Sequence, residues 1–217
     1  MNDNHAKAAL TLLEISREIT PRGWLRATSG NLSLREPGTG IIYITKSGVN
    51  KERLAPADVI SLNPEGAVIS GEGKPSFETA IHRTIYQTTD AGAVFHVHSV
   101  YNNVATQYAN NHELIFQGHE MLKALGHWDE DALVAIPVVP NHRDINRVAD
   151  IISRVINPLV PAILLERHGV YAFGKTADDA LRHLEALEFL FEWLCLARLT
   201  GALSQNSPNP NTTKYLA

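Results

Sequence analysis

The sequence predicts an α/β fold with a mixed sheet that is covered by helices. Short apolar stretches typical of strands alternate with longer amphipathic stretches typical of helices along the chain. Several successive strands are joined by links too short for a crossover helix, so some neighbouring strands must be antiparallel. No repeat and no linker divides the chain. We therefore expect a single domain over residues 1–204, followed by a polar tail rich in Pro and Asn at 205–217.

The first part of the chain indicates one helix and a group of short strands. Leu10, Leu13 and Ile19 lie on one helical stretch, which Pro21 and Gly23 bring to an end. The predicted elements are a helix over 1–19, strands within 24–35 and 40–48 joined by the turn EPGT, a short helix over 55–62 and a strand over 66–73.

The second part of the chain alternates helices and strands. Phe77, Ile81 and Ile85 repeat every four residues and form the inward stripe of a helix, and Pro75 suits its first turn. The predicted elements are helices over 75–89, 100–108, 119–125, 144–156 and 176–200, and strands over 93–99, 113–117, 132–140 and twice within 161–174.

Charge and composition exclude several classes of protein. The chain has 19 Lys and Arg against 23 Asp and Glu, a net charge of −4, and no basic cluster, so we expect no nucleic-acid partner. No apolar run approaches the ~20 residues of a membrane span, and the first residues lack the layout of a signal peptide. The single cysteine, Cys195, has no internal disulfide partner and lies in an apolar helical stretch, where a core role is expected. We therefore expect a cytoplasmic protein that binds no membrane.

Two histidines interrupt the apolar strand AVFHVHS, at His96 and His98. Side chains alternate between the two faces of a strand, so both imidazoles leave the face opposite to Val97. Two nitrogen ligands on one face suggest a metal, although an isolated pair is as often a pair of ordinary histidines. A catalytic zinc usually takes three protein ligands, and His168, at a strand end beside Gly169, is the candidate for the third. Alone, His168 would be an ordinary turn residue.

Two carboxylates could serve as a general acid or base near such a metal. Glu78 lies one helix before the histidine strand, but it could equally form a solvated i, i+4 pair with His82. Glu120, in the segment GHEML, opens a predicted helix, where its charge could instead interact with the helix dipole. The residues alone leave both alternatives open.

Three small-residue loops are suited to binding a phosphate oxyanion. They are TSGN at 28–31, KSG at 46–48 and KPS at 74–76, each with a hydroxyl and free backbone N–H groups beside a glycine or a helix start. The chain contains neither of the glycine-rich nucleotide-binding motifs, so a nucleotide is not indicated. Each loop alone is an ordinary turn, and their joint presence is what favours a phosphate site.

Taken together, TSGN, ITKSG, KPSFETAIH, FHVHS and LLERHGV have an order and spacing that resembles the class II, zinc-dependent aldolase and adducin family, over about residues 10–200. The resemblance implies a three-layer α/β/α fold with a mixed central sheet, and a homotetramer whose active sites lie between subunits. It implies one Zn²⁺ per subunit on His96, His98 and His168. It also implies a sugar-phosphate substrate whose phosphate lies among Asn31, Ser47, Gly48 and Ser76. Phe77 departs from the second serine of the aldolases, which puts one phosphate contact in doubt.

Within the family, GHEMLKAL, ITKSGVNKERL and RHGVYAFGKT resemble the members that dehydrate 5-methylthioribulose 1-phosphate to 2,3-diketo-5-methylthiopentyl 1-phosphate in methionine salvage. This narrower resemblance implies a lyase with Glu120 as the acid/base. Glu78 stands where the aldolases keep theirs, so an aldolase or 4-epimerase remains the alternative. A non-catalytic domain like the adducin head is a third alternative, and the presence of all three histidines counts against it.

Overall fold

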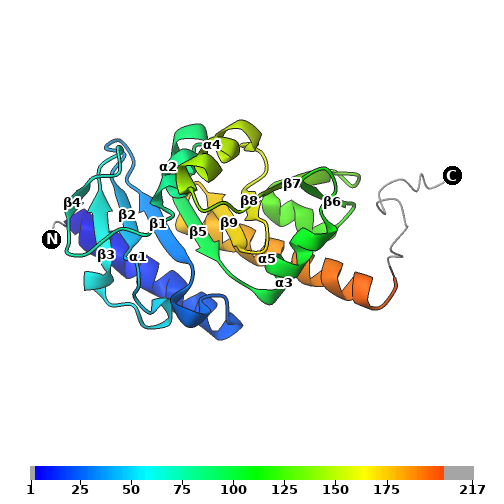
Figure 1. Ribbon diagram of the computed structural model, residues 1–217, viewed down its shortest axis with the longest axis horizontal. Helices are drawn as coiled ribbons and strands as arrows, with labels where there is room; N and C mark the ends of the chain where they lie inside the picture. The colour runs from blue at the N-terminus through cyan, green and yellow to red at the C-terminus, as the bar shows by residue number, and fades with distance from the viewer. Residues whose placement is uncertain (1–2, 203–217) are drawn as a thin grey trace.

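The central feature of the molecule is a sheet of nine strands in the order β4-β3-β2-β1-β5-β9-β8-β7-β6 (Figure 1). The structure is a computed structural model and describes residues 3–202. Neighbouring strands are antiparallel except for β7 and β8, which run parallel, so the sheet is mixed as the sequence predicts. The strands are β1 (Asn31–Arg35), β2 (Ile42–Thr45), β3 (Val59–Leu62), β4 (Val68–Ser70), β5 (Ala93–Val97), β6 (Glu113–Gln117), β7 (Leu133–Val139), β8 (Ala162–Leu165) and β9 (Gly169–Gly174).

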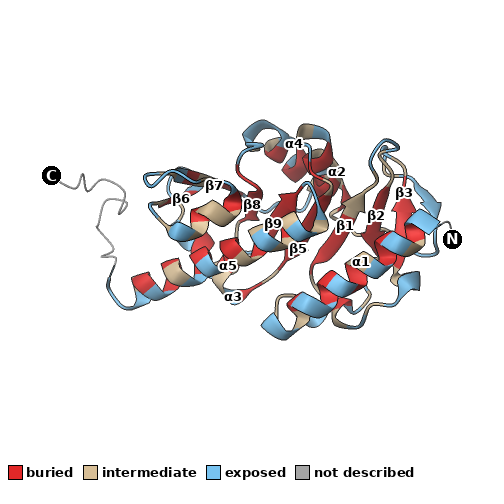
Figure 2. Ribbon diagram, turned by 180° about the vertical axis from the view of Figure 1, so that it is seen from behind, coloured by how far each residue is buried: buried red, intermediate tan, exposed pale blue. Residues whose placement is uncertain are grey.

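Helices cover both faces of the sheet and complete the three layers. The buried sides of the helices face the strands (Figure 2). One core lies under α1 (Asp3–Ile19), α3 (Val100–Ala105) and α5 (Ala177–Leu199), and it includes Phe95 and Val97 of β5. The other core lies under α2 (Thr79–Thr88) and α4 (Ile145–Val155) and includes Val94 and Tyr171. The α/β fold with a mixed central sheet is therefore confirmed, and no helix within residues 3–202 could span a membrane.

The register of the middle strands brings distant parts of the sequence to one end of the sheet. Asn31 of β1 pairs with His96 of β5, and Val97 of β5 pairs with Val170 of β9. The strand β5 therefore carries its last residues between the start of β1 and the start of β9. Loops that join the strands at this end can reach the side chains of β5.

Two predicted helices differ from the structure. The segment 55–62 forms only one 3-10 turn, Pro56–Asp58, and then becomes strand β3, whose four residues are all buried. The helix expected from Pro75 begins at Thr79, because Pro75 is paired with Lys46 and lies beside the sheet instead. The segment Glu120–Leu125 is helical but of the 3-10 type, and Gly126, with a φ of 93°, ends it as predicted. The predicted tail at 205–217 lies outside the described residues.

Candidate metal centre

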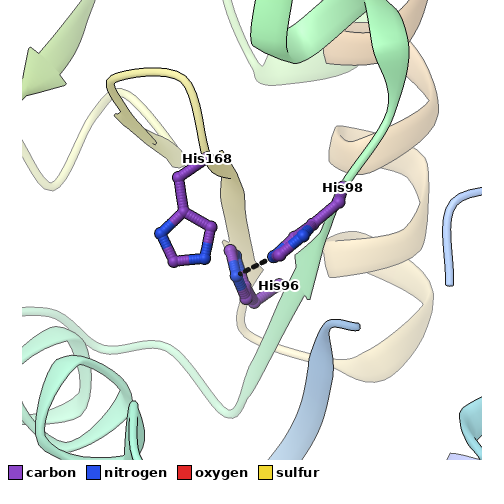
Figure 3. A group of neighbouring side chains, drawn as sticks. All are labelled: His96, His98 and His168. Carbon is purple, nitrogen blue, oxygen red and sulfur yellow. Dashed lines mark hydrogen bonds between the residues drawn. The ribbon is translucent and has the colours of Figure 1, made fainter. Parts of the chain in front are cut away.

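Three histidines converge at the end of β5 where β1 and β9 begin (Figure 3). His96 is the fourth residue of β5, His98 follows the strand, and His168 lies in the turn that leads into β9. One ring nitrogen from each histidine lies within 4.8 Å of the corresponding atoms of the other two. The two histidines of AVFHVHS do share a face, as the alternation of side chains predicts, with 2.8 Å between their Nε2 atoms.

Neighbouring groups fix the orientation of the His96 ring and the backbone position of His168. His96 Nδ1 lies 3.0 Å from the carbonyl oxygen of Val170, which can only accept, so Nδ1 carries the proton and Nε2 presents a lone pair. Tyr171 stacks on the same ring, with centroids 3.9 Å apart and planes at 13°. Asn103 on α3 donates to the carbonyl oxygen of His168 at 2.7 Å and holds that turn. Such partners set the tautomer and the orientation of metal ligands in proteins.

Gly169 is required beside the histidines because a side chain there would collide with them. A Cβ atom on Gly169 would lie 2.5 Å from the carbonyl oxygen of Val97, 2.8 Å from the His98 ring and 2.9 Å from the His96 ring. The glycine therefore allows β9 to approach the end of β5 closely.

Burial keeps the first two imidazoles neutral. His96 is fully buried, and this burial lowers its pKa to about 4. Burial, followed by the nearby His96, lowers the pKa of His98 to about 3. The neutral imidazole is the form that binds a metal ion, so both groups are ready to act as ligands at neutral pH.

Glu78, at the residue before α2, lies against the three histidines. Its side chain is 13% exposed, and its carboxylate oxygens lie 3.3 Å from His96 Nε2 and 3.0 Å from His168 Nε2. Burial favours the neutral acid, but the positive charge that His96 takes on at the low pH where Glu78 titrates, together with the hydrogen bonds from His168 and Asn31, outweighs it and holds the pKa of Glu78 well below its ordinary value. The site is therefore a set of imidazole nitrogens beside a carboxylate anion.

This donor set fits a divalent metal ion. Three imidazole nitrogens with one position left open are the usual ligands of a catalytic zinc. Nε2 of His96 carries a lone pair 2.8 Å from Nε2 of His98, and a bound cation would satisfy this atom without adding a proton to a fully buried ring. The residues predicted to hold Zn²⁺ are thus assembled within one chain.

The three predicted phosphate loops lie next to one another. Asn31, at the end of the first loop, donates through Nδ2 to Ser76 Oγ at 3.1 Å and to Glu78 at 2.6 Å. The second and third loops are joined by the backbone bond from Ser47 N–H to the carbonyl oxygen of Lys74 at 3.1 Å. Ser47 and Gly48 are exposed, while Asn31 is buried and Ser76 half-buried. Asn31, which pairs with His96 across the sheet, therefore borders the histidine cluster, Ser76 lies behind it against Asn31 and Glu78, and Ser47 and Gly48 form an outer rim.

Glu120 is not brought to the histidines within the chain. Its side chain is 83% exposed, and its carboxylate accepts a bond from Lys123 at 2.8 Å. The next residue along, Met121, lines a cleft of about 1100 Å³ that His98 and Trp24 also line. Of the two predicted carboxylates, Glu78 lies at the site, and Glu120 lies on a segment that borders the adjoining cleft.

Several site residues escaped the sequence analysis. Lys51 is 3% exposed and donates from Nζ to the carbonyl oxygen of Thr28 at 3.0 Å, so a buried cation lies under the first phosphate loop. Asn103 and Tyr171, described above, support the histidines. Nothing in the spacing of these residues signals their roles, because each acts through a contact with a distant part of the chain.

Comparison with known proteins shows the family to which this chain belongs. The family model described as "Class II Aldolase and Adducin N-terminal domain" matches residues 11–195. The chain belongs to the class II aldolase and adducin family. This is a metal-dependent family, in agreement with the histidine cluster.

Relatives of known name lie close to this chain within the class II aldolase and adducin family. The chain is 40% identical over 185 residues to a protein of Geobacillus thermodenitrificans named methylthioribulose-1-phosphate dehydratase, covering 84% of this chain and 88% of the relative. A protein of Bacillus subtilis with the same name is 39% identical over 186 residues, covering 84% and 89%. These matches extend over more than four-fifths of both partners.

Solved structures confirm the fold. L-fuculose-1-phosphate aldolase from Thermus thermophilus superposes with a TM-score of 0.73 at 24% identity, covering 92% of this chain and all of that one. A sugar-phosphate aldolase from Thermotoga maritima superposes with a TM-score of 0.68 at 19% identity, covering 93% and 97%. At these identities the likeness concerns the architecture, which is the class II aldolase fold expected from the sequence.

Proposed function

We propose that this protein is a lyase that removes water from 5-methylthioribulose 1-phosphate and forms 2,3-diketo-5-methylthiopentyl 1-phosphate. The observation that carries the proposal is that the chain is about 40% identical to several proteins named methylthioribulose-1-phosphate dehydratase. The matches cover about nine-tenths of the length of these relatives. The assembled histidine cluster supports it, because a catalyst of this reaction must stabilise negative charge next to a carbonyl group.

His96, His98 and His168 would hold one Zn²⁺. The bound ion supplies a Lewis acid that withdraws charge from the substrate oxygens next to the carbon that loses its proton. Two of the rings are already neutral and that of His96 is already oriented, so the chain loses little freedom when the ion binds.

The phosphate group would lie among the three loops. Asn31 and Ser76 offer an amide and a hydroxyl next to the histidines, and Ser47 and Gly48 offer exposed backbone and hydroxyl groups at the rim. Gly48 has a φ of 74°, a left-handed backbone conformation that residues other than glycine rarely adopt. This conformation sets the direction of the backbone N–H groups in the loop. Lys51, beneath the first loop, adds positive charge to this side of the site.

Glu120 would act as the acid/base. A proton leaves C3 of the substrate, the hydroxyl group leaves C4 as water, and the resulting enol takes a proton at C4 to become the second ketone. A carboxylate can take the first proton and return a proton to the leaving hydroxyl if it is free to move between them. Glu120 is exposed and has one described partner, Lys123, whereas Glu78 is fixed by contacts with Asn31, His96 and His168.

The protein would act as a homotetramer with its sites between subunits. The cleft of about 1100 Å³ beside His98 has exposed apolar side chains along it, including Val100, Val104 and Phe189. A second copy seated there would cover this apolar surface and enclose the substrate. Sedimentation velocity measures the oligomeric state directly.

An aldolase acting on another sugar phosphate is the second candidate, and the position of Glu78 favours it. Glu78 lies against the histidines, where it could exchange a proton with a substrate oxygen. Such an enzyme would break the bond between C3 and C4 and release a smaller carbonyl compound. A non-catalytic binding domain is disfavoured because all three histidines are present and assembled.

The deciding experiment uses zinc-loaded protein and 5-methylthioribulose 1-phosphate. We expect a diketone product lighter by one water, detected by mass spectrometry. The Glu120→Gln variant should lose at least about 100-fold in kcat while it keeps its zinc. Glu78→Gln is the matched control at the other carboxylate and should lose less. No turnover by folded, zinc-loaded protein would refute the proposal. Loss of turnover in Glu78→Gln alone, with release of an aldehyde, would support the aldolase.

A further inference from the structure

A continuous line of buried polar side chains runs from the candidate site into the layer between the sheet and α2. Asn31 and Ser33 lie on β1, and His82 and Tyr86 lie on the facing side of α2. All four are less than 5% exposed. The line starts at Glu78, which Asn31 contacts at 2.6 Å. Neighbouring polar groups this deep in a core need fixed partners, so the direction of each hydrogen bond carries information.

The first bond in the line fixes the orientation of the Asn31 amide. The Asn31 amide lies 2.6 Å from a carboxylate oxygen of Glu78 and 3.1 Å from Ser76 Oγ, and a carboxylate anion can only accept. The Asn31 atom that faces it must therefore be the Nδ2 amide group, which also donates to Ser76 Oγ. The amide oxygen of Asn31 then points the other way, into a close contact with Nε2 of His82.

The remaining bonds follow from the first. Because the Asn31 oxygen only accepts, His82 must carry a proton on Nε2. Full burial lowers the pKa of His82 to about 4, so the ring has one proton and its Nδ1 atom accepts from the Ser33 hydroxyl at 2.7 Å. The Ser33 oxygen in turn accepts from the Tyr86 hydroxyl at 2.7 Å. The bonds therefore run in one direction, from Tyr86 through Ser33 and His82 to Asn31 and Glu78.

We propose that His82 is a positioning residue for the substrate site: its Nε2–H group locks the Asn31 amide so that the NH₂ group faces Glu78 and the phosphate loops. The reversed amide would place an oxygen against the Glu78 carboxylate and against a phosphate anion, and both contacts would be repulsive. Among the described residues, the hydrogen bonds of His82 go to Asn31 and Ser33 and to none of the three metal-binding candidates, so His82 reaches the site through Asn31. The tautomer of His82 does not depend on the proposed function, and only the kinetic part of the test below rests on it.

The tautomer can be measured directly by long-range ¹H–¹⁵N NMR of the histidine rings in the zinc-loaded protein. We expect His82 to be neutral, with its proton on Nε2, from pH 8 down to pH ~5, given a pKa of about 4. A spectrum of His82→Gln assigns the signal by its absence. A proton on Nδ1, or a charged ring at pH 7, would overturn the proposal even if the enzyme is active.

Two substitutions separate positioning from simple core packing. His82→Gln keeps an N–H donor that can reach the Asn31 oxygen, whereas His82→Leu fills similar space with no donor. We expect His82→Leu to raise KM by about 10-fold, with a smaller change in kcat and with zinc content unchanged, because a freed amide loses about one hydrogen bond to the phosphate. His82→Gln should stay within about 3-fold of the wild type. Thr84→Val, a polar-to-apolar change on the same helix whose side chain is outside the line, is the control.

The outcomes are distinct. Equal KM values for His82→Leu and the wild type would show that the Asn31 amide keeps its orientation without His82 and would refute the proposal. Equal damage in His82→Gln and His82→Leu would point to packing and would also refute it. If His82→Leu does not fold, the NMR measurement on the wild type still decides the tautomer. If no variant turns over the substrate and the wild type is also inactive, the proposed function fails while the tautomer result stands.

Discussion

The glutamate at position 188 makes the stability of this protein depend on pH in a direction that is unusual for a carboxylate. Glu188 lies in the middle of α5 and is 4% exposed. It accepts hydrogen bonds from the Ser99 hydroxyl at 2.6 Å and from Asn102 at 2.7 Å, at the start of α3 and directly after His98. Burial outweighs both bonds and raises the pKa of Glu188 from 4.5 to about 7.

The raised pKa fixes both the sign and the size of the effect. Between pH 4.5 and about 7, the folded protein keeps a proton on Glu188 that the unfolded chain has released. The free energy of unfolding contributed by this group therefore falls as the pH rises through that window. At about 1.36 kcal/mol per pH unit, the difference between the two pKa values corresponds to a loss of about 3 kcal/mol that is complete above pH ~7.

Glu188→Gln isolates this contribution, because glutamine resembles the protonated acid at every pH. Histidines 82, 96 and 98 have lowered pKa values and make the wild type lose stability as the pH falls below their unfolded value of 6.5, which hides the effect of Glu188. The difference between the two proteins cancels these histidines. Urea unfolding at equal protein concentration should show that Glu188→Gln gains about 2 to 3 kcal/mol over the wild type on going from pH 5 to pH 8.

The control is Glu14→Gln on α1, where the side chain is exposed and is not among the groups that act on Glu188. Its difference from the wild type should stay nearly constant over the same range of pH, because an exposed carboxylate gains little from folding. A constant difference for Glu188→Gln as well would refute the reasoning. It would mean that Ser99 and Asn102 stabilise the Glu188 anion enough to offset its burial.

Two further predictions concern the metal site. His96→Ala and His98→Ala should each lose stoichiometric zinc in metal analysis after dialysis while the far-UV circular dichroism is kept, and full zinc content in both would overturn the assignment of ligands. Gly169→Ala should lose zinc affinity and at least about 2 kcal/mol of stability in urea unfolding, because its Cβ would lie 2.5 Å from the Val97 carbonyl oxygen. A variant with wild-type zinc binding and stability would show that β9 can move away from β5.

Local pattern was enough to predict most of the fold. The strand at AVFHV, the two strands around the turn at His168 and the long final helix all appear where periodicity places them. The two errors have a common cause. The segment 59–62 became a buried strand because it pairs with β2, and Pro75 stayed out of the helix because it pairs with Lys46. Pairing between distant segments overrode local propensity at both places.

Site residues could be predicted from the sequence only where a single helix or strand determines their placement. Strand alternation is sufficient to place His96 and His98 on one face. The role of His82 could not be read in this way, since the atom that decides its tautomer belongs to Asn31, which lies 51 residues earlier. The i, i+4 spacing of Glu78 and His82 was visible in the sequence, but it suggested a direct pair. In the structure the two side chains are joined through Asn31.

The two candidate carboxylates, of which the narrower resemblance favours Glu120, differ most in what surrounds them. Glu78 accepts from Asn31, lies against two histidines and has a lowered pKa, and a carboxylate with a low pKa is a weak base. The Glu78 anion is therefore better suited to balance the charge of a bound cation than to take a proton from carbon.

Glu120 has the opposite properties, since it is exposed and bonded only to Lys123 among the described residues. If a second copy covers the cleft beside Met121, Glu120 will be enclosed together with the substrate, where a carboxylate can both accept and return a proton. On this reasoning the acid/base becomes effective only in the assembled oligomer, so dilution below the dissociation constant of the subunits should abolish turnover while each chain keeps its zinc.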